Sequence, residues 1–139
     1  MALVGRLHPL LIHFPIALLL SGFAAEAVAM LTGRPAWRWL AVASVRSAAV
    51  MAALAACAGW LLAGDPIVDP TPLLEWHRWL AVLGTAAAVV AALASTGLHS
   101  DSTTLRWVYR SSLLIAAALV AVAAHLGGVL VWGAHFVRL

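Results

Sequence analysis

Charged residues are scarce in this sequence, and every basic side chain is an arginine. Only 9% of the 139 residues are charged and 65% are hydrophobic, whereas a soluble domain averages about 25% charged residues. Soluble packing cannot cover this much apolar surface, so the solvent for most of the chain is lipid. The composition therefore excludes an ordinary soluble domain and predicts a membrane protein.

Cysteine is represented by Cys57 alone. A single thiol excludes an internal disulfide, a thiolate metal cluster and a Cys-x-x-Cys-His haem attachment. The sequence also lacks a phosphate-binding loop, a nucleophile–base pair and a carboxylate dyad. A stand-alone hydrolase or transferase is therefore not expected, and the enzymatic role that remains is at most that of a redox subunit. The arginines are scattered singly near segment ends, which argues against nucleic-acid binding.

Four long apolar segments alternate with stretches rich in proline, glycine and polar residues. Each is at least as long as the ~20 residues that a bilayer-spanning helix needs. They cover residues 9–31, 37–63, 74–98 and 105–137. Short connections favour antiparallel neighbours. We therefore predict an all-α membrane protein, with one domain over residues 1–139 and four transmembrane helices in an up-down bundle. No tandem repeat is evident, and Pro15 is expected to kink or loosen the start of the first helix.

Arginine positions predict the orientation of the bundle. Arg34, Arg38, Arg106 and Arg110 flank the connections after the first and third segments, and three arginines lie toward the other face. Because positive residues favour the cytoplasmic side, both termini are expected outside. Tryptophans near both sets of helix ends are typical of the aromatic belts at the two membrane interfaces.

Histidines are concentrated at one face of the predicted bundle. The alternating topology brings five of the six to the same side, and His99 lies alone in a loop on the other side. The five are His8, His13, His77, His125 and His135.

Two of these histidines, His13 and His125, are expected inside the hydrocarbon region. An ionisable side chain at that depth is costly and usually has a partner or a function. Gly127 and Gly128 follow His125 closely, and such small residues leave a flat space in which a planar macrocycle could pack.

Imidazole is a common axial ligand of haem and also binds zinc, copper, iron and nickel. Neither a cysteine nor an acidic cluster accompanies these histidines. We therefore expect a haem b held by two of His13, His77 and His125, with His8 as a further candidate. Arg78 lies at the same face and could neutralise the haem propionates.

Two alternatives remain open from the residues alone. In the first, His13, His77 and His125 form a copper or zinc site in a metal-binding or transport protein. In the second, the chain is a non-redox accessory subunit of a larger membrane complex, and its histidines form helix–helix hydrogen bonds.

An ion pair is expected inside the opposite half of the bundle. Glu26 lies in the later part of the first segment and Arg46 in the earlier part of the second. Because an isolated charge in the membrane is expensive, the two are expected to pair and clamp the helices together.

Four motifs stand out along the chain: LHPLLIHFPIA at residues 7–17, Gly59-Trp60, His77-Arg78-Trp79 and His125-Leu126-Gly127-Gly128. They resemble a family of small bacterial membrane proteins known as domain of unknown function 2231. The resemblance spans nearly the whole chain and implies a four-helix domain in the bacterial inner membrane.

The family motif matches His8, His13, His77 and His125, whereas His135 lies outside it. Some relatives are joined to c-type cytochrome segments, which favours electron transfer. The resemblance thus implies membrane or periplasmic redox subunits, a quinone or a c-type cytochrome as partners.

Overall fold

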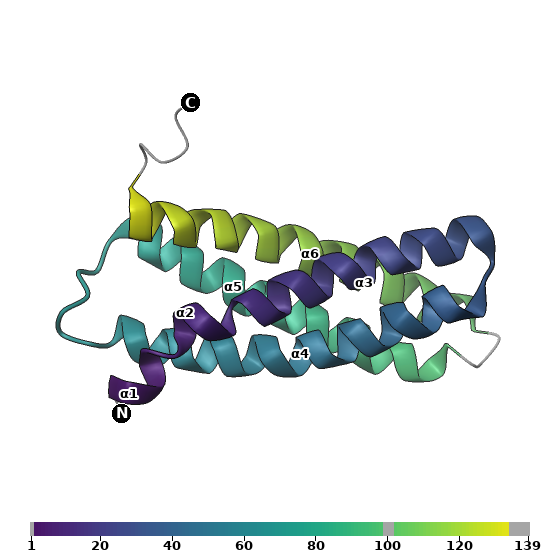
Figure 1. Cartoon of the computed structure of the whole chain (residues 1–139), viewed down its shortest axis with the longest axis horizontal. Helices are drawn as coiled ribbons and strands as arrows, with labels where there is room; N and C mark the ends of the chain where they lie inside the picture. Colours follow the sequence, from purple (N-terminus) through teal and green to yellow (C-terminus); the bar gives the residue numbers. More distant parts are fainter. Residues whose placement is uncertain (1, 99–101, 134–139) are drawn as a thin grey trace.

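The computed structural model describes residues 2–98 and 102–133. All regular secondary structure in these residues is helical. Three short elements accompany four long helices (Figure 1). In chain order the elements are α1 (Ala2–Gly5), α2 (His8–Leu11), α3 (His13–Thr32), α4 (Pro35–Ala63), α5 (Pro72–Ala94), the 3-10 helix η1 (Ser95–Gly97) and α6 (Thr103–Trp132).

The helix ends follow from local residue chemistry. Gly33 adopts a left-handed conformation with φ of 66° and ends α3, as is common for glycine at this position. The hydroxyls of Thr71 and Ser102 accept hydrogen bonds from backbone N–H groups in the first turns of α5 and α6. Pro35 and Pro72 occupy first helical positions, where a missing N–H costs nothing.

The first membrane span is interrupted close to its start. Helix α2 ends at Leu11 and α3 begins at His13. Pro15 has no N–H to donate to the carbonyl of Leu11, and the next bond, from Ile16 N to Ile12 O, is 3.4 Å long. The expected loosening of the first turns by Pro15 therefore takes the form of a joint between α2 and α3.

Four helical spans among the described residues are long and apolar enough to cross a membrane: His8–Thr32, Pro35–Ala63, Pro72–Gly97 and Thr103–Trp132. They run alternately up and down in one elongated bundle (Figure 1), which confirms the predicted fold class. Most of their ends lie within two residues of the predicted limits, and the predicted end at residue 137 lies outside the described residues.

The bundle consists of two helical hairpins. Helix α3 packs mainly against α4, and α5 packs mainly against α6. Contacts of α4 with α5 and of α3 with α6 join the hairpins. Where the helices meet, the core is rich in alanine, with Leu19, Val45, Tyr109 and Leu113 as its largest buried side chains besides Ser95. Small residues of this kind let membrane helices approach closely.

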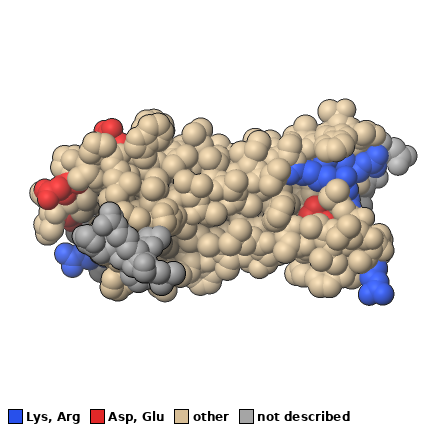
Figure 2. Space-filling model, turned by 90° about the horizontal axis from the view of Figure 1, so that it is seen from above, with Lys and Arg blue, Asp and Glu red and all other residues tan. Residues whose placement is uncertain are grey.

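The outer surface is apolar along the middle of the bundle and charged at its two ends (Figure 2). Exposed leucines, isoleucines and valines cover the helices. Trp39 and Trp107 are exposed at one end, and Trp76 and Trp132 at the other. This surface suits a bilayer, with tryptophans near both interfaces.

Candidate functional site

Two histidines from different hairpins meet inside one end of the bundle. His8 opens α2 and His77 lies in the second turn of α5. Their ring centroids are 6.2 Å apart and their planes make an angle of 80°. Both side chains are partly buried.

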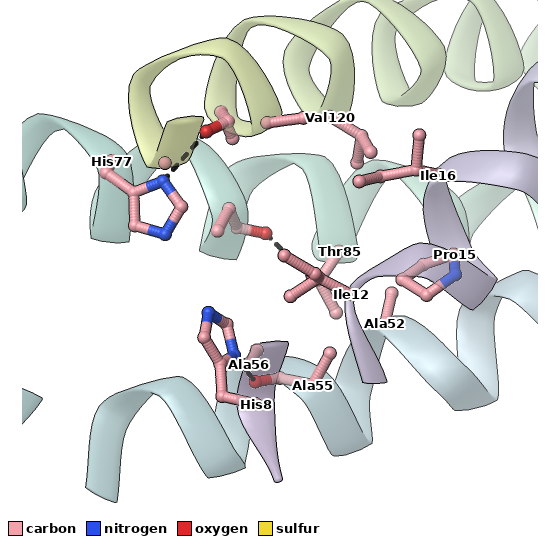
Figure 3. A pocket seen from close by; sticks show the side chains of 14 residues that line it. His8, Ile12, Pro15, Ile16, Ala52, Ala55, Ala56, His77, Thr85 and Val120 are labelled. Atoms are coloured by element: carbon pink, nitrogen blue, oxygen red, sulfur yellow. Dashed lines mark hydrogen bonds between the residues drawn. The ribbon is translucent and has the colours of Figure 1, made fainter. Parts of the chain in front are cut away.

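Each imidazole is fixed by one backbone carbonyl of the neighbouring helix in its own hairpin. The Nδ1 of His8 lies 2.8 Å from the carbonyl oxygen of Ala55, and the Nδ1 of His77 lies 2.8 Å from that of Ala123. A carbonyl oxygen only accepts, so Nδ1 carries the proton in both rings and donates it. In the neutral form of each ring, the lone pair is then on Nε2. These two nitrogens face one another across a gap (Figure 3).

Glycines in α4 and α6 provide the space for the rings. A Cβ atom on Gly59 would lie 2.7 Å from Cε1 of His8, and one on Gly127 would lie 3.1 Å from Cε1 of His77. Any larger residue at Gly59 would therefore displace the imidazole of His8. A Cβ on Gly128, the next residue of α6, would meet nothing within 4 Å.

A cavity of about 480 Å³ opens beside the two rings. This volume falls in the range of about 300–1,000 Å³ that is typical of small-molecule sites. Apolar residues such as Ile12 and Ala56 form much of its wall, and Asp69 of the α4–α5 connection lies at its edge. A smaller space of about 70 Å³ continues between the helices from the same two histidines.

Arg78 adds a positive charge to the wall of this cavity. Its guanidinium carbon lies 3.8 Å from the centre of the Trp60 ring, and Trp60 packs edge-on against Trp79. The Nε of Arg78 is buried and has no hydrogen-bond partner within the described residues. The site thus has two ring nitrogens that can accept or coordinate and one guanidinium that can donate.

Residues 6–137 match the family described as "Predicted membrane protein (DUF2231)". The chain belongs to this family. The match includes every residue of the histidine site. A comparison with curated proteins gives no match, and a comparison with solved structures gives none either. The resemblance seen in the sequence is therefore confirmed, and the DUF2231 chain is a multi-pass membrane protein with four candidate spans.

The structure of this DUF2231 protein does not bring His13, His77 and His125 together. His13 and His125 are exposed on the outer surface of the bundle. His13 follows His8 by five residues, which turns it about 140° around a helix, and His125 is about 200° from the inward-facing Ala123. Within residues 2–98 and 102–133, no group of three or more His, Cys, Asp or Glu side chains is placed to hold a metal ion. The expected three-histidine metal site is therefore not formed. His99 and His135 lie outside the described residues.

The expected pair of Glu26 with Arg46 is also not formed. The carboxylate Oε1 of Glu26 accepts from Nε of Arg110 at 2.9 Å and lies 3.5 Å from Nη2 of Arg38. Arg46 instead donates from Nε to the hydroxyl of Ser95 at 2.9 Å.

Counting from the helix ends gives the reason for this correction. Glu26 lies six residues before the end of α3, and Arg110 lies seven residues after the start of α6, so the two are at nearly the same depth. Arg46 lies eleven residues into α4 and is therefore deeper by about 7 Å. Figure 2 shows basic side chains gathered at one end of the bundle, whereas acidic side chains and a further basic one lie at the other end.

Proposed function

We propose that this protein binds haem b between His8 and His77 and serves as an electron-transfer subunit of a membrane oxidoreductase. The observation that carries the proposal is that a backbone carbonyl holds Nδ1 of each ring and the two Nε2 atoms face one another. Metal–nitrogen bonds of about 2 Å on each side of a metal place two opposed imidazole centroids about 6 Å apart. The observed separation is 6.2 Å.

The tautomer of the two rings favours a Lewis acid over other membrane ligands. With Nδ1 committed to the carbonyls of Ala55 and Ala123, each Nε2 offers a lone pair and no proton. A quinone carbonyl needs a donor, which these nitrogens do not provide. His8 and His77 would each offer one Nε2 lone pair to a metal centre, and a proton donated by Nδ1 to a carbonyl is the usual support of a ligating histidine.

The remaining walls suit the rest of a haem. The apolar cavity beside the rings could take the macrocycle, and Arg78 could pair with a propionate through its unpartnered Nε. Haem iron in this position would accept and release one electron at a time. The donor and acceptor we propose are a quinone pool or membrane enzyme and a redox protein outside the membrane, with both termini on that outer side of the bacterial inner membrane.

A bare transition metal is the second candidate. The two Nε2 atoms could hold copper or zinc, but zinc usually takes four ligands and the described residues bring only two nitrogens together. This candidate has fewer ligands than its chemistry prefers, so haem is the better match to the donor set.

The test is an absorption spectrum of the full chain purified after expression with added haem precursor. We expect a Soret band, and sharp visible bands after dithionite reduction. His8→Ala and His77→Ala should each lose the spectrum of a six-coordinate haem. His13→Ala and His125→Ala are the matched controls. His13 in α3 and His125 in α6 are exposed on the outer surface of the bundle, so both variants should leave the spectrum unchanged.

Three outcomes would overturn the proposal. A wild-type protein that folds without a Soret band would remove haem. Copper or zinc bound without that band would favour the metal-binding alternative. A folded protein that carries neither haem nor metal would leave the accessory-subunit role.

A further inference from the structure

The two hairpins bury equivalent positions. The first comparison is between α3 and the α5–η1 segment. Each buried residue of α3 from residue 15 to residue 26 has a buried counterpart 69 residues later. The buried set Pro15, Leu19, Gly22, Ala25 and Glu26 corresponds to Gly84, Ala88, Ala91, Ala94 and Ser95.

The second helices of the hairpins show the same relation at an offset of 68 residues. All six buried residues of α6 have a buried counterpart in α4. The set Tyr109, Leu113, Ala116, Ala117, Val120 and Ala123 corresponds to Ala41, Val45, Ala48, Ala49, Ala52 and Ala55. The dipeptides Arg38-Trp39 and Arg106-Trp107 are related by the same offset. Helical periodicity alone would produce similar burial, but it would not reproduce the Arg-Trp dipeptide at the same offset.

The histidine site follows the same two offsets. His8 and His77 are 69 residues apart, and Gly59 and Gly127 are 68 apart. The hydrogen bond from each imidazole to its carbonyl is 2.8 Å long. The carbonyl follows the histidine by 47 residues in the first hairpin and by 46 in the second. Each hairpin therefore supplies one histidine, one carbonyl that sets its tautomer and one glycine that makes room for it.

We propose that the chain is an internal duplication of one helical hairpin and that its ligand site is two equivalent half-sites joined face to face. Both copies enter the bundle from the same end, as in membrane proteins built from parallel repeats about an axis along the membrane normal. The inference deepens the proposed function and rests on it for the identity of the ligand. It assigns Gly59 and Gly127 as positioning residues that act through His8 and His77.

Equivalent half-sites restrict the class of ligand. A molecule held by both must present the same chemistry to each imidazole. A metal at the centre of a planar macrocycle does so, because its two axial positions are alike. A ligand with one polar end, such as a fatty acid, cannot satisfy both half-sites at once.

The first experiment needs no bound cofactor. Nitrogen NMR of the cofactor-free, ¹⁵N-histidine-labelled protein reports which ring nitrogen carries the proton, and His8→Ala and His77→Ala assign the two signals. We expect the same Nδ1–H tautomer for both residues. Different tautomers would overturn the equivalence of the half-sites, whatever the protein is later found to bind.

The second experiment uses the haem-loaded protein and the glycines. Gly59→Ala and Gly127→Ala should each weaken one axial bond, so that both give a five-coordinate, high-spin spectrum, with the larger effect at Gly59, where the added Cβ comes closer. Gly128→Ala is the matched control and should keep the six-coordinate spectrum, because its Cβ meets nothing within 4 Å.

The two experiments separate failure of the inference from failure of the proposed function. Wild-type protein without a Soret band would remove haem while equal tautomers still supported two half-sites. A haem spectrum that both Gly59→Ala and Gly127→Ala left unchanged would overturn the positioning role. If either glycine variant failed to fold, the tautomers of the wild-type rings would still test the equivalence of the half-sites.

Discussion

Replacing Glu26 with alanine is expected to destabilise the bundle far more than replacing any exposed acid. The Glu26 side chain is 4% exposed and accepts from Arg110 at 2.9 Å, with Arg38 at 3.5 Å. Removing it leaves two guanidinium groups beside one another without their shared counter-charge. The network lies at the end of the bundle away from His8 and His77. Binding of any cofactor at the histidine site should therefore survive this substitution.

The magnitude follows from the exposure of the partners. Removing one member of a buried ion pair costs about 3–5 kcal/mol, because the other charge stays buried and uncompensated. The side chains of Arg38 and Arg110 are 32% and 25% exposed, so water and lipid headgroups can solvate part of each charge. We therefore expect the lower end, about 3 kcal/mol, which is roughly a 100-fold change in the unfolding equilibrium constant.

Unfolding in mixed micelles of mild detergent and dodecyl sulfate, followed by tryptophan fluorescence, measures this loss. Glu75→Ala, which removes an exposed acid in the first turn of α5, is the control and should change stability by less than about 0.5 kcal/mol. Arg110→Ala should cost less than Glu26→Ala, about 2 kcal/mol, because Glu26 keeps Arg38. An effect of Glu26→Ala no larger than that of Glu75→Ala would refute this reasoning.

Three further predictions concern the cavity and the core. Arg78→Gln should lower the haem reduction potential by about 40 mV, equivalent to about 1 kcal/mol for one electron; a redox titration that shows no shift would contradict a propionate contact. Ala56→Phe should fill the cavity and abolish the Soret band, whereas Leu54→Phe on the exposed surface of α4 should retain it, and both are checked by absorption after size-exclusion chromatography. Leu19→Ala, at a fully buried position, should cost about 2–3 kcal/mol in the same micelle assay, and Leu20→Ala, 44% exposed, should cost much less.

Hydropathy and length were sufficient to predict the fold. Four apolar runs of about 20 residues or more are expected to form helices, since a helix satisfies every backbone group within its own segment and a membrane strand needs only about 9–11 residues. Alternation of direction then predicts that His8 and His77 lie at the same end of the bundle. The facing arrangement of their two Nε2 atoms could not be predicted, because it depends on the rotation of each helix about its own axis. The exposed positions of His13 and His125 have the same cause.

Other features escaped prediction for different physical reasons. The partner of Glu26 depends on depth, and a count from the helix ends would have favoured Arg110 over Arg46. The duplication is concealed because alanine is common throughout, so equivalent positions share burial more often than identity. The carbonyls of Ala55 and Ala123 have no sequence signal beyond their spacing from His8 and His77.

The break between α2 and α3 gives His8 and His77 different backbone supports, although their side-chain contacts are equivalent. His77 belongs to the uninterrupted helix α5, whereas His8 is carried by the single turn of α2, whose link to α3 includes a bond of 3.4 Å from Ile16 to Ile12. The imidazole of His8 is therefore carried by a shorter and less continuous helix than the imidazole of His77. If haem binds as proposed, we expect a small competitor such as carbon monoxide to displace His8 rather than His77, with the bundle still folded.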